Sequence, residues 1–427
     1  MSKKKKIKHN DGFVNAFTGQ GMRSRDPFVS YSVDAETPMN EEEIDNLYTF
    51  NGIAQKIVDA PADDAITEGF KLKNGLDDIE QSELVMSALE DLNWQEVFSE
   101  ALSWNRAYGG SAVLLVTNDG KPFNEPLEIT SKTRIEKLEV FSKQDITDTG
   151  YFYSDITSPK YGKPYMYTLL NQWGNSFDVH ESRLLLFRGG RLSKQKRRER
   201  QGWGASCFDI IKGRLVQYET SMNLSLAALS RLSQSVLKLN GLAEVLSSDG
   251  GDTMVQRRLQ TIDMARHFLN TIAIDSLDDY QQHGLALGGI TQIEEEFECA
   301  LSAASNIPVT ILFGRSPAGM NATGHSDFEQ YYKMVKHIQV RDLKPRLLHL
   351  IEVLNQINGW KLPEKYTIEF KPLWSMSEQE QASLKQTEVS IASGKVSAIN
   401  TLVQSEVITK EEARNILQSI INKDDVK

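Results

Sequence analysis

Apolar residues recur every three or four positions for about 70 residues after Asn40, which is the spacing of one helix face. Asn40 precedes "EEEIDNLYTF" and is expected to cap that helix, and a second helical run is expected to end at Pro61. Further helices are predicted over "DIEQSELVMSALEDLN" and "WQEVFSEALSWNRAYGG", the latter opened by a capping box of Asn93 and Glu96. The chain therefore begins its folded part with an all-helical segment.

The hydrophobic period changes between residues 111 and 190. The stretches "SAVLLVTNDGK", "RIEKLEVFS", "PYMYTLL" and "SRLLLFRGG" are short apolar or alternating runs, and the first ends in an Asn-Asp-Gly turn. These patterns predict strands and a small β-rich or mixed unit.

Helical spacing returns at residues 206–240, where apolar positions follow one face over about nine turns. The opposite face is rich in serine rather than charge, which suits packing beside identical helices. Capping boxes at Thr291 with Glu294 and at Ser326 with Glu329 predict two more helices, the second interrupted by Pro345. The residues after 358 are expected to form two or three further helices.

A glycine-punctuated loop, "FGRSPAGMNATGHSDF" at residues 313–328, lies between two of these predicted helices. It has few bulky apolar residues, so it is either a loop that cradles phosphates or one that faces something large and moving. The acidic run from Glu294 to Glu296, with Glu298, is typical of a solvated helix start, and in an oligomer it would instead face a shared channel.

Composition narrows the class of protein. The 427 residues, 40% of them hydrophobic, are enough for two or three units with their own cores. Cys207 and Cys299 give no disulfide framework and no zinc spacing, which favours a reducing compartment. No run is apolar enough for a membrane span and no secretory signal is evident. The expected fold class is α+β, mainly α.

Charge is spread unevenly. The net charge of −10 argues against a generic nucleic-acid binder. Residues 1–40, with lysines near the start, are interpreted as a mobile tail or an arm that contacts DNA. The basic run 191–200 is either a solvated loop or a contact surface for nucleic acid or an acidic partner; its candidate contact residues are Arg191, Lys194, Lys196, Arg197 and Arg198.

Two patterns favour an enzyme, each incompletely. Residues 319–326, "GMNATGHS", follow the phosphate-loop pattern except that His325 stands where its lysine belongs. His180 and Ser182 form one His-x-Ser element, but no second such element exists, although phosphoesterases of this kind use two. No zinc motif or nucleophile elbow is present, so no catalytic residue, metal or cofactor is assigned. One interpretation of the chain is therefore a nucleotide- or phosphodiester-hydrolysing enzyme that uses residues 319–326 or His180 and Ser182.

Several stretches together resemble the portal proteins of tailed bacteriophages. They are "NGIAQKIVDAPADDAITEGF", "WNRAYGGSAVLLV", "HESRLLLFRG", "GWGASCFDIIKGRLVQYETSMNL" and "ASNIPVTILFGRSPAGMNATGHSDFEQYY", within residues 47–357. The resemblance implies a ring of identical subunits, typically twelve, at one capsid vertex. The ring surrounds a channel for DNA during packaging and ejection, without enzymatic activity in the portal itself.

The resemblance also implies a division of the chain. After the tail at 1–40 we expect a wing at 41–205, a stem and clip within 206–300, a tunnel loop and core helix at 301–357, and a helical crown at 358–427. The implied tunnel-loop residues facing DNA are Arg315, Ser316, Met320, Asn321, Thr323 and His325.

The implied partners are the other subunits, double-stranded DNA, the terminase large subunit, a head-tail adaptor, and capsid and scaffold proteins, with no membrane. The implied location is the portal vertex of the virion, after assembly in the host cytoplasm. A fused cyclic-nucleotide phosphodiesterase, known beside some relatives of this family, is not expected here, because the second His-x-Ser/Thr element is missing.

Overall fold

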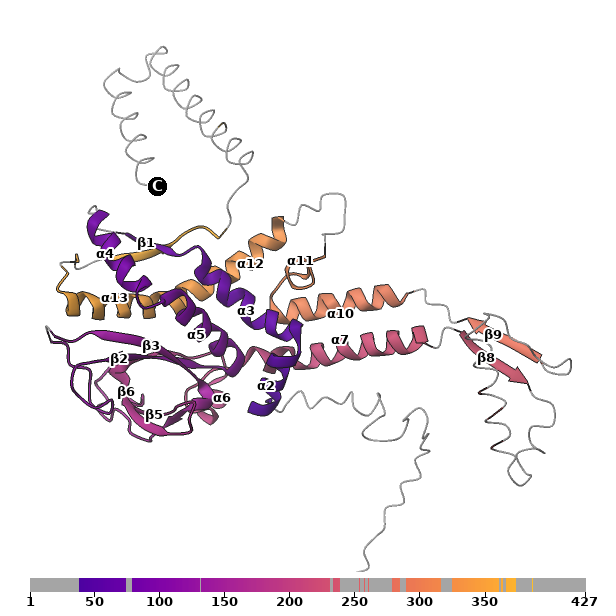
Figure 1. Ribbon diagram of the computed structural model, residues 1–427, viewed down its shortest axis with the longest axis horizontal. Coiled ribbons are helices and arrows are strands. Elements are labelled where there is room, and N and C mark those ends of the chain that lie inside the picture. The colour runs from indigo at the N-terminus through magenta and orange to yellow at the C-terminus, as the bar shows by residue number, and fades with distance from the viewer. Residues whose placement is uncertain are drawn as a thin grey trace, which may run out of the picture. The chain divides into compact units, whose positions relative to one another are not determined.

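The computed structural model describes residues 38–73, 79–130, 132–230, 233–238, 253, 257, 260, 279–284, 289–315, 325–360, 362–363, 366–373 and 386. The chain divides into two compact units, one up to Glu369 and one from Phe370 onward. Figure 1 shows that the first unit contains a helical layer, two small sheets and a projecting pair of helices.

Four helices form the N-terminal layer: α2 (Glu41–Phe50), α3 (Gly52–Thr67), α4 (Ile79–Glu90) and α5 (Trp94–Tyr108). The capping prediction for Asn40 is confirmed, because its side chain accepts from the Glu43 backbone N–H while the Glu43 carboxylate accepts from the Asn40 N–H. The capping box at Asn93 is wrong. Asn93 has the left-handed φ of 50°, so α5 follows a tight turn and receives no side-chain cap.

The expectation that Pro61 ends a helix is also wrong, since α3 continues through it. Proline lacks an N–H and leaves the carbonyl four residues earlier, that of Ile57, without its helical donor. The Arg106 guanidinium of α5 replaces that donor: Nη2 donates to the Ile57 carbonyl at 2.7 Å and Nε to the Val58 carbonyl at 3.1 Å. A neighbouring helix thus keeps α3 intact.

Two three-stranded antiparallel sheets follow. In the first, β2 (Ser111–Thr117) lies between β3 (Ile135–Ser142) and β7 (Leu184–Phe187). In the second, β5 (Met166–Leu170) lies between β4 (Ile146–Asp148) and β6 (Ser176–His180). All four predicted strands are confirmed, whereas β4 and β6 were not predicted. Both sheets contribute to one core: Ala112, Leu114, Phe141, Ile146, Tyr167, Leu169, Val179, Leu184 and Trp203.

A long excursion follows β7. It contains α6 (Lys194–Glu199), α7 (Cys207–Ser230), the antiparallel strands β8 (Ser233–Lys238) and β9 (Asp279–Gly284), and α10 (Ile290–Ser305). The single helix predicted over 206–240 is wrong beyond Ser230, because residues 233–238 pair with β9 instead. The Thr291 box is wrong as well, since α10 begins at Ile290 after the left-handed Gly289.

The chain then returns to the helical layer through α11 (Val309–Leu312), α12 (His325–Ile338), a π-helical turn at Gln339–Leu343, and α13 (Lys344–Asn358). The α12 helix starts at His325, one residue before the predicted Ser326 cap. The predicted interruption at Pro345 takes the form of the π-helical turn. The Arg341 carbonyl, four residues before Pro345, accepts from Arg346 Nη1 at 3.0 Å. Strand β10 (Thr367–Phe370) pairs with β1 (Phe70–Lys73).

Candidate functional site

The most distinctive element of the structure is an arm, defined here as α7, β8, β9 and α10. Its two helices pack against each other and lead away from the sheets and helices of the body, defined here as residues 38–205 with 306–369 (Figure 1). The strands β8 and β9 close the far end of the arm. The chain therefore leaves the body along one helix and comes back along the other.

Along one face of α7, apolar side chains become more exposed with distance from the body. Phe208, Ile211 and Leu215 on that face are buried, but Leu226, farther out on the same face, is 63% exposed. Ile210 and Leu224, on the opposite side of the helix, are 64% and 50% exposed. The helix α10 behaves alike, because Leu301 is buried near the body and Ile293, nearer the strands, is 55% exposed. The predicted apolar face of α7 thus exists, but the subunit covers only its first part. A face of this kind is typical of an interface with another protein surface.

The base of the arm is a crossing of three chain segments without side chains between them. A Cβ added to Gly189 would lie 2.2 Å from the Gly109 carbonyl oxygen, and one added to Gly204 would lie 2.5 Å from the Gly189 carbonyl carbon. Backbone hydrogen bonds tie the segments, among them one from the Gly204 N–H to the Gly109 carbonyl at 2.9 Å. Trp203 closes the crossing against Gly110, where a Cβ would meet its ring. Only glycine permits this approach.

The first turn of α7 is fixed to this crossing. The Ser206 hydroxyl donates to the Ala107 carbonyl and accepts from the Phe208 N–H at 3.0 Å. Asp209, in the same first turn, pairs with Arg200 at 2.7 Å. The arm consequently starts from a rigid base.

Of the predicted tunnel-loop residues, Arg315 is the one whose side chain the structure describes. It forms two ion pairs with α10, from Nη1 to Glu298 at 2.5 Å and from Nη2 to Glu295 at 2.7 Å. Hydrogen bonds to the two carboxylates raise the pKa of the Arg315 guanidinium, and the bond to Glu298 has the largest effect. The guanidinium therefore stays charged. Phe313 packs against Tyr218 of α7, with ring centroids 5.4 Å apart. The start of the loop is thus bound to both helices of the arm.

The structure describes the other predicted tunnel-loop residues only in part. Ser316, Met320, Asn321 and Thr323 lie outside the described residues, and His325 is the first residue of α12. Sequence analysis did not identify the acidic partners of Arg315. Their spacing of three residues, Glu295 and Glu298, was the available signal, because it places both carboxylates on one helix face.

The predicted basic residues lie together on α6 and just before it, and all five are exposed: Arg191, Lys194, Lys196, Arg197 and Arg198. Lys196 pairs with Glu199 at 2.9 Å, and Arg197 donates to the Gly202 carbonyl at 3.3 Å. Among the described residues, no ion pair engages the other three. The group is a small basic surface next to the base of the arm.

The His180 and Ser182 pair has a structural role. His180 Nδ1 accepts from the Ser182 N–H at 3.2 Å and lies 2.9 Å from the Ser182 hydroxyl, so it caps the turn at residues 181–183. The same hydroxyl accepts from the Leu127 N–H at 2.8 Å. Burial lowers the pKa of the imidazole, which favours its neutral form. Both side chains are engaged in holding the 118–134 loop.

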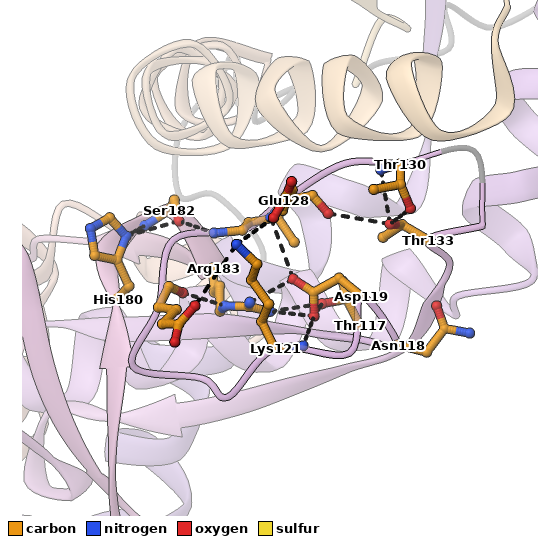
Figure 2. A network of polar contacts seen from close by, with 12 residues as sticks. Thr117, Asn118, Asp119, Lys121, Glu128, Thr130, Thr133, His180, Ser182 and Arg183 are labelled. Carbon is orange, nitrogen blue, oxygen red and sulfur yellow. Dashed lines mark hydrogen bonds and ion pairs between the residues drawn. The ribbon is translucent and has the colours of Figure 1, made fainter.

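A buried ion pair lies next to this turn, as Figure 2 shows. Arg183 Nη2 donates to Asp119 at 2.6 Å, with both side chains fully buried. The guanidinium also donates to the Thr117 hydroxyl and the Glu125 carbonyl, both at 2.9 Å. Burial acts to raise the pKa of Asp119, but hydrogen bonds from Arg183 and the Glu128 N–H outweigh it and lower that pKa. The pair therefore fixes the 118–134 loop against β7 and the turn before it.

No group of three or more His, Cys, Asp or Glu side chains among the described residues is placed to hold a metal ion. None of the described helices is long and apolar enough to cross a membrane.

Comparison with known proteins decides the family. The family model described as "Phage portal protein" matches residues 42–393. The chain belongs to the phage portal protein family. The resemblance stated from the sequence is thereby confirmed.

Two curated proteins are similar to most of this chain. An uncharacterized protein of Haemophilus influenzae is 26% identical over 378 residues, covering 88% of this chain and 83% of that protein. The "Anti-CBASS protein Acb1" of a Caulobacter species is 25% identical and matches 88% of this chain, which spans 61% of that longer protein.

The structure titled "Neck of native GTA particle computed with C12 symmetry", from a gene transfer agent, has a TM-score of 0.50 and 12% identity. The match covers 89% of this chain and 94% of that one. This similarity shows the portal fold and confirms the mixed helix and strand class, mainly helical.

Proposed function

We propose that this portal-family protein is one subunit of a ring that encloses a DNA channel at a single capsid vertex. The observation that carries the proposal is the arm, whose apolar face is buried at its base and exposed farther out. Such a face is stable in water when a neighbouring subunit covers it.

We propose twelve subunits in the ring. The neck with the same fold was computed with C12 symmetry, and both chains match over most of their lengths. A cyclic ring uses two different faces of each subunit, so the exposed side of α7 in one subunit would lie against another face of the next.

The tunnel loop is proposed to face DNA with little positive charge. Lysine and arginine contacts to phosphates release counterions and hold DNA strongly, which would oppose movement. The cationic head of Arg315 is already paired with two glutamates. The net charge of −10 supports the same interpretation. We therefore propose that Arg315 anchors the start of the loop to α10 and does not bind DNA. The proposed channel contacts are the other five residues: Ser316, Met320, Asn321, Thr323 and His325.

The remaining parts are assigned as follows. The crown at 358–427 would lie inside the capsid, and the subunits would also contact capsid and scaffold proteins. The β8 and β9 end of the arm would bind the terminase large subunit during packaging and a head-tail adaptor afterwards. The exposed basic group on α6 is a proposed contact for DNA or an acidic partner. The location would be the virion, after assembly in the host cytoplasm.

The enzymatic alternative receives no support from the described geometry. His180 and Ser182 hold a turn and a loop, and residues 319–324 lie outside the described residues. The role in the name of the Caulobacter relative belongs to that longer protein. Nucleotide turnover that disappears in His325→Ala would contradict a purely structural role.

The decisive test is assembly. Native mass spectrometry and negative-stain imaging of the full chain should show rings of about twelve subunits with a central hole. Leu226→Asp should prevent ring formation, because it places a charge on the exposed apolar face, and should leave thermal unfolding of the subunit unchanged. Asn223→Asp, an exposed polar position on the same helix, is the matched control. Normal rings from Leu226→Asp, or a wild-type subunit that stays monomeric even with scaffold protein, would argue against the proposal.

The channel role needs a second experiment. Deletion of residues 316–323 should leave rings and capsids intact but reduce DNA packaging, which is measured as the DNA-filled fraction of heads. If this deletion variant fills its heads normally, the loop does not act in the channel. The ring proposal would not be affected by that result.

A further inference from the structure

Two surfaces of the body carry opposite charges that the subunit does not neutralise by itself. The first is the basic surface on and before α6, where residues 191–200 contain six cations and one carboxylate. Lys196 pairs with Glu199, and Arg200 pairs with Asp209. Among the described residues, no ion pair engages the other four cations, all of which are exposed: Arg191, Lys194, Arg197 and Arg198.

The backbone of the basic surface is already fixed. Its two ends are joined by an antiparallel bridge between Gly190 and Ala205, with backbone hydrogen bonds of 3.1 Å in both directions. Ser193 caps α6, because its hydroxyl accepts from the Lys196 N–H at 3.3 Å. A partner therefore does not have to order this loop when it binds, which lowers the cost of binding.

The second surface lies around the turn between α4 and α5. Residues 74–105 contain eight carboxylates and no lysine or arginine. Four of the carboxylates belong to exposed side chains at the end of α4 and in the first half of α5, and we call them the acidic turn: Glu90, Asp91, Glu96 and Glu100. Within the described part of the chain, no ion pair engages any of them.

The charges of the acidic turn repel one another. Glu96 and Glu100 are four residues apart on α5, where like charges are destabilising. Glu90 lies at the C-terminal end of α4, whose last turn has no basic residue, so its charge adds to the negative end of the helix dipole. The backbone is held in place nonetheless, because Leu89 and Trp94 on either side of the turn are buried. A cationic surface would relieve this repulsion without rearranging the turn.

The two surfaces lie at separate places in the body, as Figure 1 shows for α6 and α4. A cyclic ring joins two different faces of each subunit, so the face with α6 can meet the face with the acidic turn of the next subunit. DNA fits the basic surface less well, because phosphate contacts from four unpaired cations would hold a duplex that has to move.

We propose that the basic surface of each subunit binds the acidic turn of a neighbouring copy of the same chain. The inference rests on the proposed ring and names one of its subunit contacts. Lys194 and Arg198 are four residues apart on α6, the same spacing as Glu96 and Glu100 on α5, so two charge pairs can form along facing helices. Exposed ion pairs add little affinity, but opposite charges speed association and fix the register. The contact thus selects which faces of two subunits meet.

Charge reversal is the first test, and the rate of ring assembly from dissociated subunits is followed by light scattering. Lys194→Glu with Arg198→Glu should slow assembly about tenfold at low salt and leave thermal unfolding unchanged. Lys132→Glu with Lys163→Glu, two exposed lysines outside the basic surface, is the matched control and should assemble at the wild-type rate. A reversal variant that assembles as fast as this control would overturn the proposal.

Mixing shows whether the acidic turn is the partner. Glu96→Lys with Glu100→Lys should also assemble slowly by itself. A mixture of this variant with the α6 reversal variant should recover the wild-type rate, because each subunit then offers the charges that the other needs. Native mass spectrometry should find equal numbers of the two subunits in the mixed rings. A mixture that assembles as slowly as its components would show that the two surfaces do not meet.

Cross-linking of the wild type locates the contact. A carbodiimide joins a lysine amine to a carboxylate that it touches, so Lys194 should be linked to Glu96 or Glu100, and in mixtures of labelled and unlabelled chains the link should join two different chains. Rings without this link would overturn the inference and leave the proposed ring intact, whereas a chain that forms no oligomer would contradict both. If the α6 reversal leaves assembly unchanged but abolishes binding of a DNA duplex, measured by fluorescence anisotropy, the basic surface binds DNA and the inference is rejected.

Discussion

The body and the arm bury their apolar residues in different ways. In the body, two sheets and the helical layer enclose a core whose members are almost fully buried, and its charged groups are paired inside. In the arm, burial falls within a few helical turns, from Leu215 to Leu226. The core of the body is thus closed within one subunit, although single apolar side chains such as Phe50 and Trp173 are exposed on its surface, whereas one apolar face of α7 passes from buried to exposed along the arm. Substitutions in the core of the body should therefore affect folding, and substitutions in the arm should affect assembly.

The largest effect is expected at the glycine crossing. In Gly189→Ala the new Cβ would meet the Gly109 backbone, and φ of +48° already disfavours a side chain. We expect a loss of more than about 4 kcal/mol in the free energy of unfolding, or no folded subunit. Urea denaturation followed by circular dichroism measures it. Gly174→Ala has a similar φ of +78° but open space around it, so it should cost only about 1 kcal/mol.

The buried ion pair comes next. Asp119→Asn leaves the Arg183 guanidinium buried without its counterion, and we expect a loss of about 3 kcal/mol. The double variant Asp119→Leu with Arg183→Met should recover much of that loss, since it removes both charges. Removal of an exposed ion pair by Lys137→Met should leave the urea midpoint unchanged. An Asp119→Asn variant as stable as the wild type would contradict the assigned role of the pair.

An effect of intermediate size on the free energy of unfolding is expected around Pro61 in α3. Arg106→Ala leaves the buried Ile57 and Val58 carbonyls without donors, at an expected cost of about 2 kcal/mol. In a Pro61→Ala background the restored N–H can bond to the Ile57 carbonyl, so the same Arg106→Ala change should cost less. A double-mutant cycle in urea measures this coupling. Strictly additive effects would show that Arg106 does not substitute for the missing donor.

The pH dependence of stability should follow Asp119. Its pKa is lowered in the folded state, so its contribution is present above the unfolded pKa of about 4 and is lost as pH falls through the folded value. Urea midpoints measured from pH 7 down to pH 3 should fall more steeply for the wild type than for the Asp119→Leu, Arg183→Met variant. Parallel profiles would assign the acid sensitivity to other carboxyl groups.

The smallest effect on folding is expected in the arm. Leu226→Ser changes an exposed side chain and should alter the subunit's free energy of unfolding by less than about 0.5 kcal/mol. It should still weaken the association between subunits, which sedimentation at several concentrations measures. A large loss of subunit stability would mean that the arm belongs to the body's core after all.

Sequence patterns predicted the parts of this fold that depend on nearby residues. The Asn40 box and the four main strands are local patterns of side-chain spacing. The errors at Pro61 and Asn93 arose because a distant arginine or a left-handed turn, neither visible in a local pattern, decided the outcome. Similarly, Arg315 could be placed on the loop from its position, but its pairing with Glu295 and Glu298 depends on how α10 packs beside the loop.

The glycine crossing also provides a structural criterion for recognising this architecture in distant sequences. Three segments meet there, at Gly109–Gly110, Gly189–Gly190 and Gly204, separated by about 80 and about 15 residues. A chain that builds the same crossing needs residues without side chains at these contacts, whatever the rest of its sequence has become. A search for paired glycines after a helix and after a strand, followed by a third glycine just before a long helix, therefore tests for the crossing where overall identity is too low to use.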